Sequence, residues 1–231
     1  MHEKSLLETT SAIYKRIFAA AMRAGRNPED IVLIAVTKTV GPEHIREAID
    51  LGLRMFGENR VQEAKEKIAF FKNIPERIQW HMIGHLQRNK VKYAISMFDL
   101  IHSVDSIELA RDINSHAERI RKVQDVLVEV KLSSEKSKHG VPKDQLAGLL
   151  RAVSSMKNVT LKGLMTIPPL LEDCKDTRPF FRELRELRDA SAALGFHLPE
   201  LSMGMSDDFE IAIEEGATML RIGTALFGER R

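Results

Sequence analysis

A chain of 231 residues, 43% hydrophobic and 29% charged, is long and apolar enough to bury a sizeable core, which argues against disorder. Its 35 basic and 33 acidic side chains leave a formal net charge of only +2. They form no basic block, so the composition disfavours nucleic-acid binding. No run approaches the roughly 18 apolar residues of a membrane-spanning helix, and the first residues resemble neither a signal peptide nor a transit peptide. We therefore expect a cytoplasmic protein without a membrane partner.

The single cysteine, Cys174, supports the same compartment, because no intramolecular disulfide can form. It lies in a polar stretch between Glu172 and Asp176. We interpret it as an incidental loop residue rather than a catalytic thiol.

The first predicted element is a helix at residues 6–24, with no strand ahead of it. From residue 31 onward, short apolar runs alternate with longer amphipathic segments. Several runs, such as IVLIAV at 31–36, are continuously apolar, which is typical of strands in a parallel sheet covered by helices. In chain order the remaining predicted elements are a strand at 31–37, a helix at 42–51, a strand at 54–57, a helix at 60–71, strands at 78–83 and 99–103, a helix at 106–120, a strand at 125–131, a helix at 144–153, a strand at 160–167, a helix at 178–194, a strand at 200–203, a helix at 207–214 and a strand at 219–222.

Eight strands alternating with helices, without a linker or repeat, indicate an α/β fold, a single (β/α)8 TIM-type barrel. We expect one domain over residues 1–231, in which the helical segment 1–29 packs on a barrel formed by residues 30–231. The last helix would be truncated, and the leading helix could cover its site. An open doubly wound sheet is the alternative. It would be supported by a G-x-G-x-x-G turn after the first strand, but that turn begins at Lys38 and reads KTVGP.

Lys38 closes the most apolar run of the chain. A lysine at the mouth of a buried strand has a desolvated amine that can lose its proton near neutral pH, and a neutral amine condenses with aldehydes. The alternative is a lysine whose stem leaves the strand and carries its charge to water.

Two further strand ends suggest an anion site. Ser206 precedes the predicted helix at 207–214 and would be its N-cap, while Gly223 and Thr224 follow the last strand. Loops after the seventh and eighth strands of such barrels are a common phosphate site, where peptide N–H groups face the anion. Asp207 and Asp208 should then point away from it. An ordinary capped helix is the alternative.

Other constellations are weaker. His81 and His85 are four residues apart but straddle the end of a strand, and no H-E-x-x-H motif occurs, so we expect no metal site. The common nucleotide-binding loop and the serine-hydrolase elbow are also absent from the sequence.

The motifs at the strand ends, taken in order, resemble those of the pyridoxal phosphate homeostasis protein family, which is itself similar to the N-terminal barrel of bacterial alanine racemase. They are AVTK at 35–38, FGEN at 56–59, WHMIGHLQRNK at 80–90, GLMTIP at 163–168, LSMGMSDD at 201–208 and RIGTALFG at 221–228. Six motifs in the same order cover the chain from about residue 30 to its end.

The resemblance implies a barrel that binds pyridoxal 5′-phosphate (PLP), the vitamin B6 cofactor, with Lys38 as the Schiff-base lysine. It places Ser206, Gly223 and Thr224 at the phosphate and Arg221 at the pyridine nitrogen, with Asn59 close to the cofactor. An arginine only donates hydrogen bonds, so the ring nitrogen facing it must stay unprotonated. Such a ring is a weaker electron sink than a pyridinium, which disfavours strong carbanion chemistry.

Alanine racemase, by comparison, adds a β-domain and uses a tyrosine base from a partner subunit. This chain ends just after the predicted phosphate loop, and its two tyrosines, Tyr14 and Tyr93, lie outside the strand-end motifs. Without a second base, proton transfer on both faces of an amino-acid α-carbon lacks a participant. We therefore expect no catalytic residue and interpret the chain as a non-enzymatic carrier in intracellular PLP homeostasis.

The alternative is a weak amino-acid racemase-like PLP enzyme, in which Lys136 or Lys138 could act as a base or bind a carboxylate. A third interpretation is a regulatory module that binds another protein through its PLP face. Besides PLP, the expected partners are apo forms of PLP-dependent enzymes and small amines or amino acids. We expect a monomer.

Overall fold

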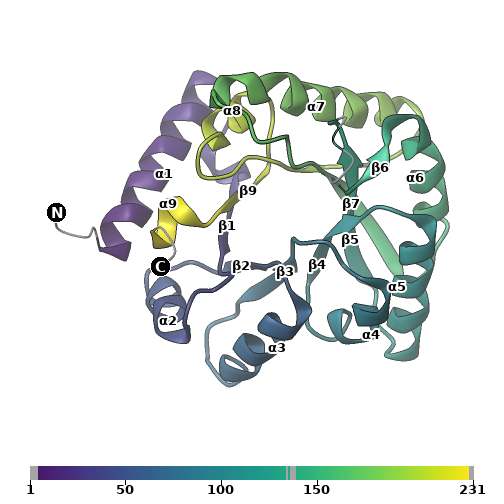
Figure 1. Cartoon of the computed structure of the whole chain (residues 1–231), viewed down its shortest axis with the longest axis horizontal. Coiled ribbons are helices and arrows are strands. Elements are labelled where there is room, and N and C mark those ends of the chain that lie inside the picture. Colours follow the sequence, from purple (N-terminus) through teal and green to yellow (C-terminus); the bar gives the residue numbers. More distant parts are fainter. Residues whose placement is uncertain (1–4, 134, 136–138, 229–231) are drawn as a thin grey trace.

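The computed structural model describes residues 5–133, 135 and 139–228, and within them parallel strands close into a barrel surrounded by helices (Figure 1). Neighbouring strands follow the order β4-β3-β2-β1-β9-β8-β7-β5, and a further pairing of β4 with β5 closes the ring. A short ninth strand, β6, pairs only with the end of β5 and stays outside the ring. The predicted eight-stranded barrel is confirmed.

The strands have the following bounds: Val32–Val36 (β1), Met55–Glu58 (β2), Gln79–Met82 (β3), Leu100–Val104 (β4), Gln124–Lys131 (β5), Val141–Pro142 (β6), Val159–Met165 (β7), Glu200–Ser202 (β8) and Met219–Ile222 (β9). The helices are Leu6–Arg23 (α1), Pro42–Asp50 (α2), Val61–Phe70 (α3), Val91–Ala94 (α4), Ile107–Arg119 (α5), Leu146–Ser154 (α6), Arg178–Ala193 (α7), Phe209–Glu214 (α8) and Thr224–Phe227 (α9).

The strand alternation separates two apolar regions. Outward-facing strand residues pack with the helices in the main core. Inward-facing residues form a smaller cluster inside the barrel, made of Ile34, Leu100, Leu127, Met165 and Met219. Because this inner cluster fills only part of the barrel, polar side chains occupy inward positions nearer the carboxyl ends of several strands.

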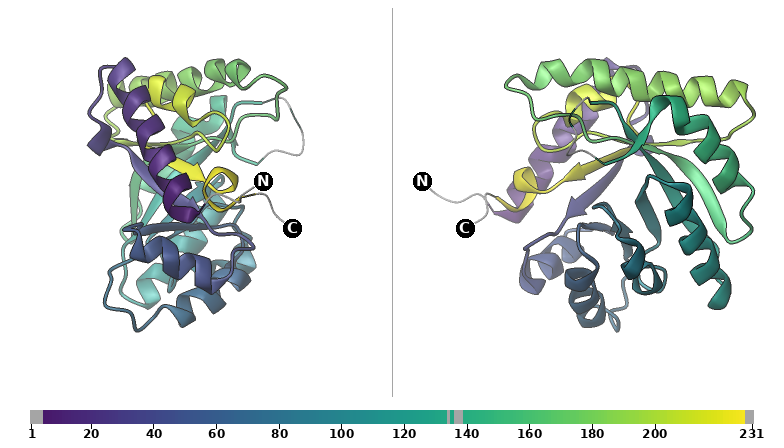
Figure 2. Two further views of the ribbon diagram at one scale, coloured as in Figure 1. Left: turned by 90° about the vertical axis from the view of Figure 1, so that its left-hand side faces the viewer. Right: turned by 45° about the vertical axis from the view of Figure 1, so that its right-hand side comes forward.

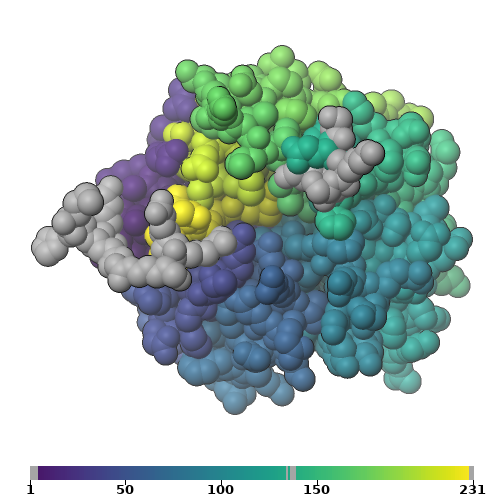
Figure 3. All heavy atoms as spheres, in the orientation of Figure 1, coloured from purple at the N-terminus to yellow at the C-terminus, as the bar shows by residue number. Residues whose placement is uncertain are grey.

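The leading helix α1 begins with a capping box, in which Ser5 and Glu8 satisfy each other's backbone N–H groups. Its buried face packs against α8 and α9. The last helix, α9, has only four residues, so α1 covers the part of the barrel that a full final helix would occupy (Figure 2). The space-filling view shows α1, in purple, beside α9, in yellow, so the first and last described helices lie next to each other (Figure 3).

Each predicted strand is present, with bounds that differ by a few residues. The elements that were not predicted are β6, α4, α9 and the 3-10 turns Pro28–Asp30, Arg88–Lys90 and Cys174–Thr177. Each has two to four residues, which is too short to show a period in the sequence. Within the described part of the chain, no helix is both long and apolar enough to cross a membrane.

Candidate functional site

The six residues predicted for the site line one cavity of about 190 Å³ at the carboxyl ends of the strands. They come from the two ends of the chain: Lys38 and Asn59 follow β1 and β2, Ser206 follows β8, Arg221 belongs to β9, and Gly223 and Thr224 follow β9. The sequence did not predict the other lining residues, which are Val36, Ile83, Ile167, Met205 and Asp207.

Lys38 is half-buried and lies in a tight turn directly after β1. The turn is closed by a hydrogen bond from the Val40 N–H to the Thr37 carbonyl oxygen, 2.9 Å long. Thr39 has a φ of 65°, a left-handed conformation that is unfavourable for a β-branched residue. The lysine therefore sits in a backbone segment whose shape is imposed by its surroundings.

Lys67 of α3 is one source of that constraint. Its amine lies 2.5 Å from the Thr37 carbonyl oxygen and also pairs with the carboxylates of Glu58, at 2.7 Å, and Glu63, at 2.6 Å. Glu58 accepts a second hydrogen bond from the Thr37 hydroxyl, and Glu63 accepts one from the Thr39 N–H. This lysine–carboxylate cluster therefore holds the residues on both sides of Lys38.

The two carboxylates of the cluster differ in their environment. Burial raises the pKa of Glu58, although Lys67 and Thr37 donate hydrogen bonds to it. Burial also acts to raise the pKa of Glu63, but hydrogen bonds from Lys67 and from the Thr39 N–H outweigh it, so the pKa lies below its ordinary value. Glu63 is the more exposed of the two.

Arg221 is 4% exposed, which is unusual for a guanidinium. It donates to the Ser202 hydroxyl at 2.5 Å and to the Thr166 carbonyl oxygen at 2.9 Å. Burial lowers its pKa to about 10, so it remains a cation at neutral pH. Arginine carries five N–H donors, and those not directed at Ser202 and Thr166 are available to the cavity that it lines.

The predicted role of Ser206 as a helix N-cap is wrong. Helix α8 begins at Phe209, and Asp208 occupies the N-cap position. The Ser206 hydroxyl instead accepts a hydrogen bond from the Ala225 N–H at 3.1 Å, which joins the loop after β8 to the segment after β9. The two loops expected to form the anion site are therefore connected through this serine.

The two aspartates after Ser206 differ from each other. The Asp208 carboxylate turns back and accepts a hydrogen bond from the Met205 N–H at 2.6 Å. Asp207 contributes to the lining of the cavity, contrary to the expectation that both would point away.

Gly223 provides a close approach between strands. A Cβ atom at this position would lie 3.3 Å from the Val36 Cβ and 3.4 Å from the Val36 carbonyl oxygen, so any other residue would crowd the end of β1.

Across the cavity, the Asn59 side-chain oxygen is buried and has no hydrogen-bond partner among the described residues. An unsatisfied buried acceptor at this point suits a ligand that brings a donor.

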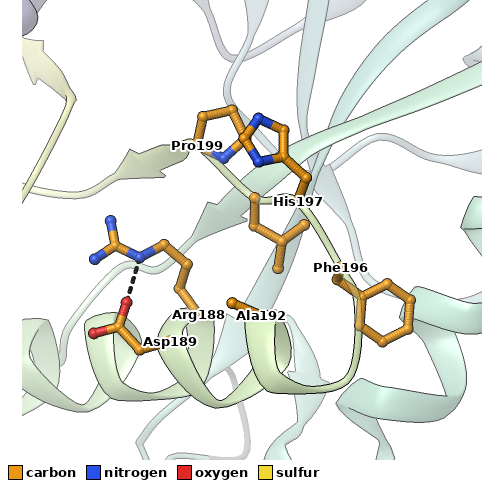
Figure 4. A pocket seen from close by; sticks show the side chains of 7 residues that line it. Arg188, Asp189, Ala192, Phe196, His197 and Pro199 are labelled. Atoms are coloured by element: carbon orange, nitrogen blue, oxygen red, sulfur yellow. Dashed lines mark hydrogen bonds and ion pairs between the residues drawn. The ribbon is translucent and has the colours of Figure 1, made fainter.

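Two other cavities differ in their position relative to this site: one adjoins it and one is remote from it. One of about 450 Å³ adjoins it, since Asn59 lines both, and carries the basic side chains of Arg60 and Lys90. Another lies where the chain enters β8, at the opposite end of the strands, between the end of α7 and the loop that includes His197 (Figure 4). It contains no predicted site residue.

His81 and His85 do not lie at one site: His81 is buried beside His102, whereas His85 is exposed and contacts other residues. Among the described residues, one group has metal-ligand chemistry: His85, Asp105 and His139, whose ligand atoms lie within 4.8 Å of one another. The two imidazole rings stack with their centroids 3.8 Å apart and their planes 11° from parallel. Lone pairs in parallel planes do not converge on one ion, so the arrangement is that of a stacked pair rather than a formed metal centre.

Tyr14 on α1 and Tyr93 on α4 are both exposed and lie outside the cavity. Cys174 begins a short 3-10 turn, also away from the cavity. Lys136 and Lys138 lie outside the described residues.

Sequence reasoning missed the polar residues behind Arg221. His102 on β4 and Ser202 on β8 are fully buried, and His81 on β3 is 2% exposed. The available signal was a polar residue at an inward position of an otherwise apolar strand, because a buried polar group must find a partner.

The fold and the site together define a PLP-type barrel of the alanine racemase N-terminal class. The sequence model for that family, "Alanine racemase, N-terminal domain", matches residues 11–231. The alanine racemase of Clostridium difficile 630 has the same fold, with a TM-score of 0.71 at 15% identity, covering 94% of this chain and 56% of the racemase.

More similar relatives define the family within that class. The chain is 49% identical to the pyridoxal phosphate homeostasis protein of Aquifex aeolicus (97% of this chain and 98% of the relative) and 42% identical to that of Escherichia coli K12 (93% and 92%). PipY of Synechococcus elongatus PCC7942, solved with PLP bound, has a TM-score of 0.83 at 39% identity and covers 94% of this chain and 100% of PipY. This chain belongs to the pyridoxal phosphate homeostasis protein family.

Proposed function

We propose that this chain binds PLP in the cavity at the end of β1, holds it as a Schiff base on Lys38, and serves intracellular PLP homeostasis as a carrier rather than as an enzyme. The observation that carries the proposal is that six residues chosen from strand-end motifs line one cavity. Membership of the homeostasis family and the PLP bound by PipY support it.

The cavity offers a complementary group for each part of the cofactor. PLP supplies an aldehyde carbon that a lysine amine can join, a phosphate, and an electron-withdrawing ring. Lys38 would join the aldehyde. Ser206, Gly223 and Thr224 lie together on the two connected loops that would receive the phosphate, and the missing side chain at Gly223 lets its loop pack closely on Val36. Arg221 would donate to the ring nitrogen.

The same residues explain the absence of an evident catalytic role. Arg221 is held as a cation and can only donate, so it would favour an unprotonated ring nitrogen and a weak electron sink. Among the described lining residues, Lys38 and Asp207 are the only other ionisable groups, and no tyrosine, histidine or cysteine is present. A general base on the face opposite Lys38 is not evident.

The decisive experiment is a visible spectrum of purified protein with PLP, followed by borohydride reduction and peptide mapping. We expect a Schiff-base absorbance band and a reduced adduct on the peptide that contains Lys38. Lys38→Ala should abolish both, whereas Lys65→Ala, on the exposed face of α3, should leave both intact. A band that survives in Lys38→Ala would disprove the assignment of Lys38.

Carriage needs a separate test. Protein loaded with PLP is mixed with the apo form of a PLP-dependent enzyme, and the rate of reactivation is compared with that given by the same concentration of free PLP. Delivery predicts a faster recovery from the loaded protein. An equal or slower rate would contradict delivery while leaving cofactor binding itself intact.

A further inference from the structure

A continuous hydrogen-bond bridge crosses the interior of the barrel behind Arg221. The Arg221 guanidinium lies 2.5 Å from the Ser202 hydroxyl, which lies 2.9 Å from Nδ1 of His102. Nε2 of His102 then lies 3.1 Å from Nδ1 of His81. The bridge therefore connects β9 and β8 to β4 and β3, on the opposite wall.

Each member of this bridge is buried, with no more than 4% of any side chain exposed. A polar group in such a place is costly unless it is hydrogen-bonded, and part of the barrel interior is filled by apolar side chains. Three hydrogen bonds join these four side chains in series, so the orientation of each depends on the next.

The direction of the bridge follows from its charged end. A guanidinium has donors and no acceptor, so the Ser202 oxygen accepts from Arg221. The Ser202 proton then finds its acceptor at Nδ1 of His102, which must be unprotonated there. His102 consequently carries its proton on Nε2 and donates it to Nδ1 of His81. Both imidazoles are thus neutral, with their protons on Nε2.

The reverse direction is unfavourable for two reasons. If His102 donated to Ser202, the serine oxygen would accept twice and its own proton would have no acceptor among the described residues. If His102 carried both protons, a second cation would lie next to Arg221. Burial, His81 and Arg221 each act to lower the pKa of His102, which agrees with a neutral ring.

We infer that Ser202, His102 and His81 are positioning residues for Arg221, which fix the direction in which the guanidinium donates its remaining hydrogen bonds into the cofactor cavity. This inference rests on the proposed function, in which Arg221 faces the ring nitrogen of PLP. The bridge makes the placement of that contact depend on the far wall of the barrel. It also leaves Arg221 as the single positive charge of the bridge, so the ring nitrogen meets a fixed donor.

The first test measures PLP affinity and the position of the Schiff-base band in three variants. Ser202→Ala and His102→Leu should each weaken PLP binding roughly tenfold, as expected when a charged hydrogen bond loses its alignment, and should shift the band. His102→Asn should retain most of the affinity, because its side-chain oxygen can accept from Ser202 where Nδ1 does. Ser103→Ala is the matched control, since Ser103 is equally buried on β4 and its hydroxyl has no partner among the described residues.

Binding by Ser202→Ala that matches Ser103→Ala in affinity and band position would overturn the inference. Unchanged PLP binding by His102→Leu would also overturn it, because Ser202 alone would then position Arg221 and the two histidines would have no part in it. A merely structural role would lower thermal stability without shifting the band.

The second test does not depend on the cofactor. Nitrogen-15 NMR of the histidines in PLP-free protein should show His81 and His102 neutral and protonated at Nε2, with assignments made from single-histidine variants. A proton on Nδ1 of His102 would refute the direction of the bridge. If wild-type protein failed to bind PLP, the proposed function and the role of the bridge toward PLP would both fall, whereas the tautomers would still show whether the bridge itself exists.

Discussion

The amine of Lys67 lies 2.5 Å from the carbonyl oxygen of Thr37, the residue immediately before Lys38. This contact gives a lysine on a covering helix a role in shaping the turn that carries a different lysine. The same amine neutralises Glu58, whose carboxylate is completely buried. One side chain therefore contacts both a buried carboxylate of the fold and the turn that carries Lys38.

We predict that Lys67→Met destabilises the protein by about 3–5 kcal/mol, because it leaves the Glu58 carboxylate buried without its cation. Urea denaturation measures this directly. The double variant Lys67→Met with Glu58→Gln removes the uncompensated charge and should recover most of the loss. If the double variant then binds PLP as well as wild type, the cluster does not position Lys38.

Ser206→Ala should weaken PLP binding roughly tenfold and leave the binding of pyridoxal unchanged, because only PLP carries the phosphate that we assign to this loop. Titration of each ligand, followed by absorbance, gives the two affinities. Equal losses for both ligands would indicate that Ser206 acts by holding the loop to Ala225 and not through the phosphate.

Gly84 and Gly148 form a matched pair of glycines. A Cβ at Gly84 would overlap the carbonyl oxygen of Asn59, so Gly84→Ala should destabilise the fold and reduce PLP binding by displacing Asn59. Gly148 lies within α6 with open space around it, and Gly148→Ala should stabilise the protein by about 0.5–1 kcal/mol. Thermal denaturation and PLP titration of both variants check the pair. If Gly84→Ala changed neither the thermal stability nor the PLP affinity, the backbone at Asn59 could move to accommodate the added methyl group.

Acid should destabilise the protein partly through His81, whose pKa burial lowers from 6.5 to about 4. Between these two values the unfolded chain binds a proton that the folded chain does not, so stability falls as the pH falls from 6.5 to 4. A difference of about 2.5 pKa units corresponds to a loss of about 3 kcal/mol. Burial of His102 acts in the same direction.

The variant His81→Asn isolates this contribution, because it keeps an acceptor for His102 but does not titrate. Its free energy of unfolding should change less than that of wild type between pH 6.5 and 4. Parallel pH curves for the two proteins would mean that His81 titrates similarly in the folded and unfolded states.

The cavity predicts little exchange at an amino-acid α-carbon. When L-alanine is incubated with PLP-loaded protein in D2O, NMR should show α-deuteration no faster than with free PLP, because a second base is not evident. Rapid deuteration that disappears in Lys38→Ala would favour the racemase-like alternative.

The strands and the cavity could be predicted because both depend on local patterns. Continuous apolar runs identify buried parallel strands, and in a barrel their carboxyl ends must meet on one face. The six residues from Lys38 to Thr224 therefore had to lie near one another once the ring was assumed. The resemblance to a known family then selected these residues among the other polar residues on that face.

The lysine–carboxylate cluster could not be predicted in this way. Residues 60–71 show a helical apolar face through Val61 and Ala64, and a lysine in such a helix is ordinarily solvated. Lys67 instead lies on the buried side, because its long stem crosses apolar surface and two glutamates from different elements meet its charge. Glu63 is four residues away on the same helix, but Glu58 lies on β2 and Thr37 lies 30 residues away after β1, so the helical pattern alone does not reveal the cluster. The bridge from His102 to Ser202 could not be predicted either, because these two residues are far apart in the sequence.

The N-cap prediction for Ser206 failed for a different reason. A serine before an amphipathic segment predicts an N-cap, but the chain takes one more turn and the helix begins at Phe209. The competing hydrogen bond from the Ala225 N–H determines the outcome, and that residue belongs to a segment beyond the next strand.

The pairing of β1 with β9 has a consequence for biosynthesis. Lys38, which would capture the cofactor, leaves the ribosome well before Arg221, Gly223 and Thr224 are synthesised. Until β9 and the segment after it dock, β1 lacks a neighbour on one side and the cavity lacks the lining that Arg221, Gly223 and Thr224 provide. A nascent or prematurely terminated chain would therefore be unable to retain the vitamin, and cofactor uptake would mark the completion of folding.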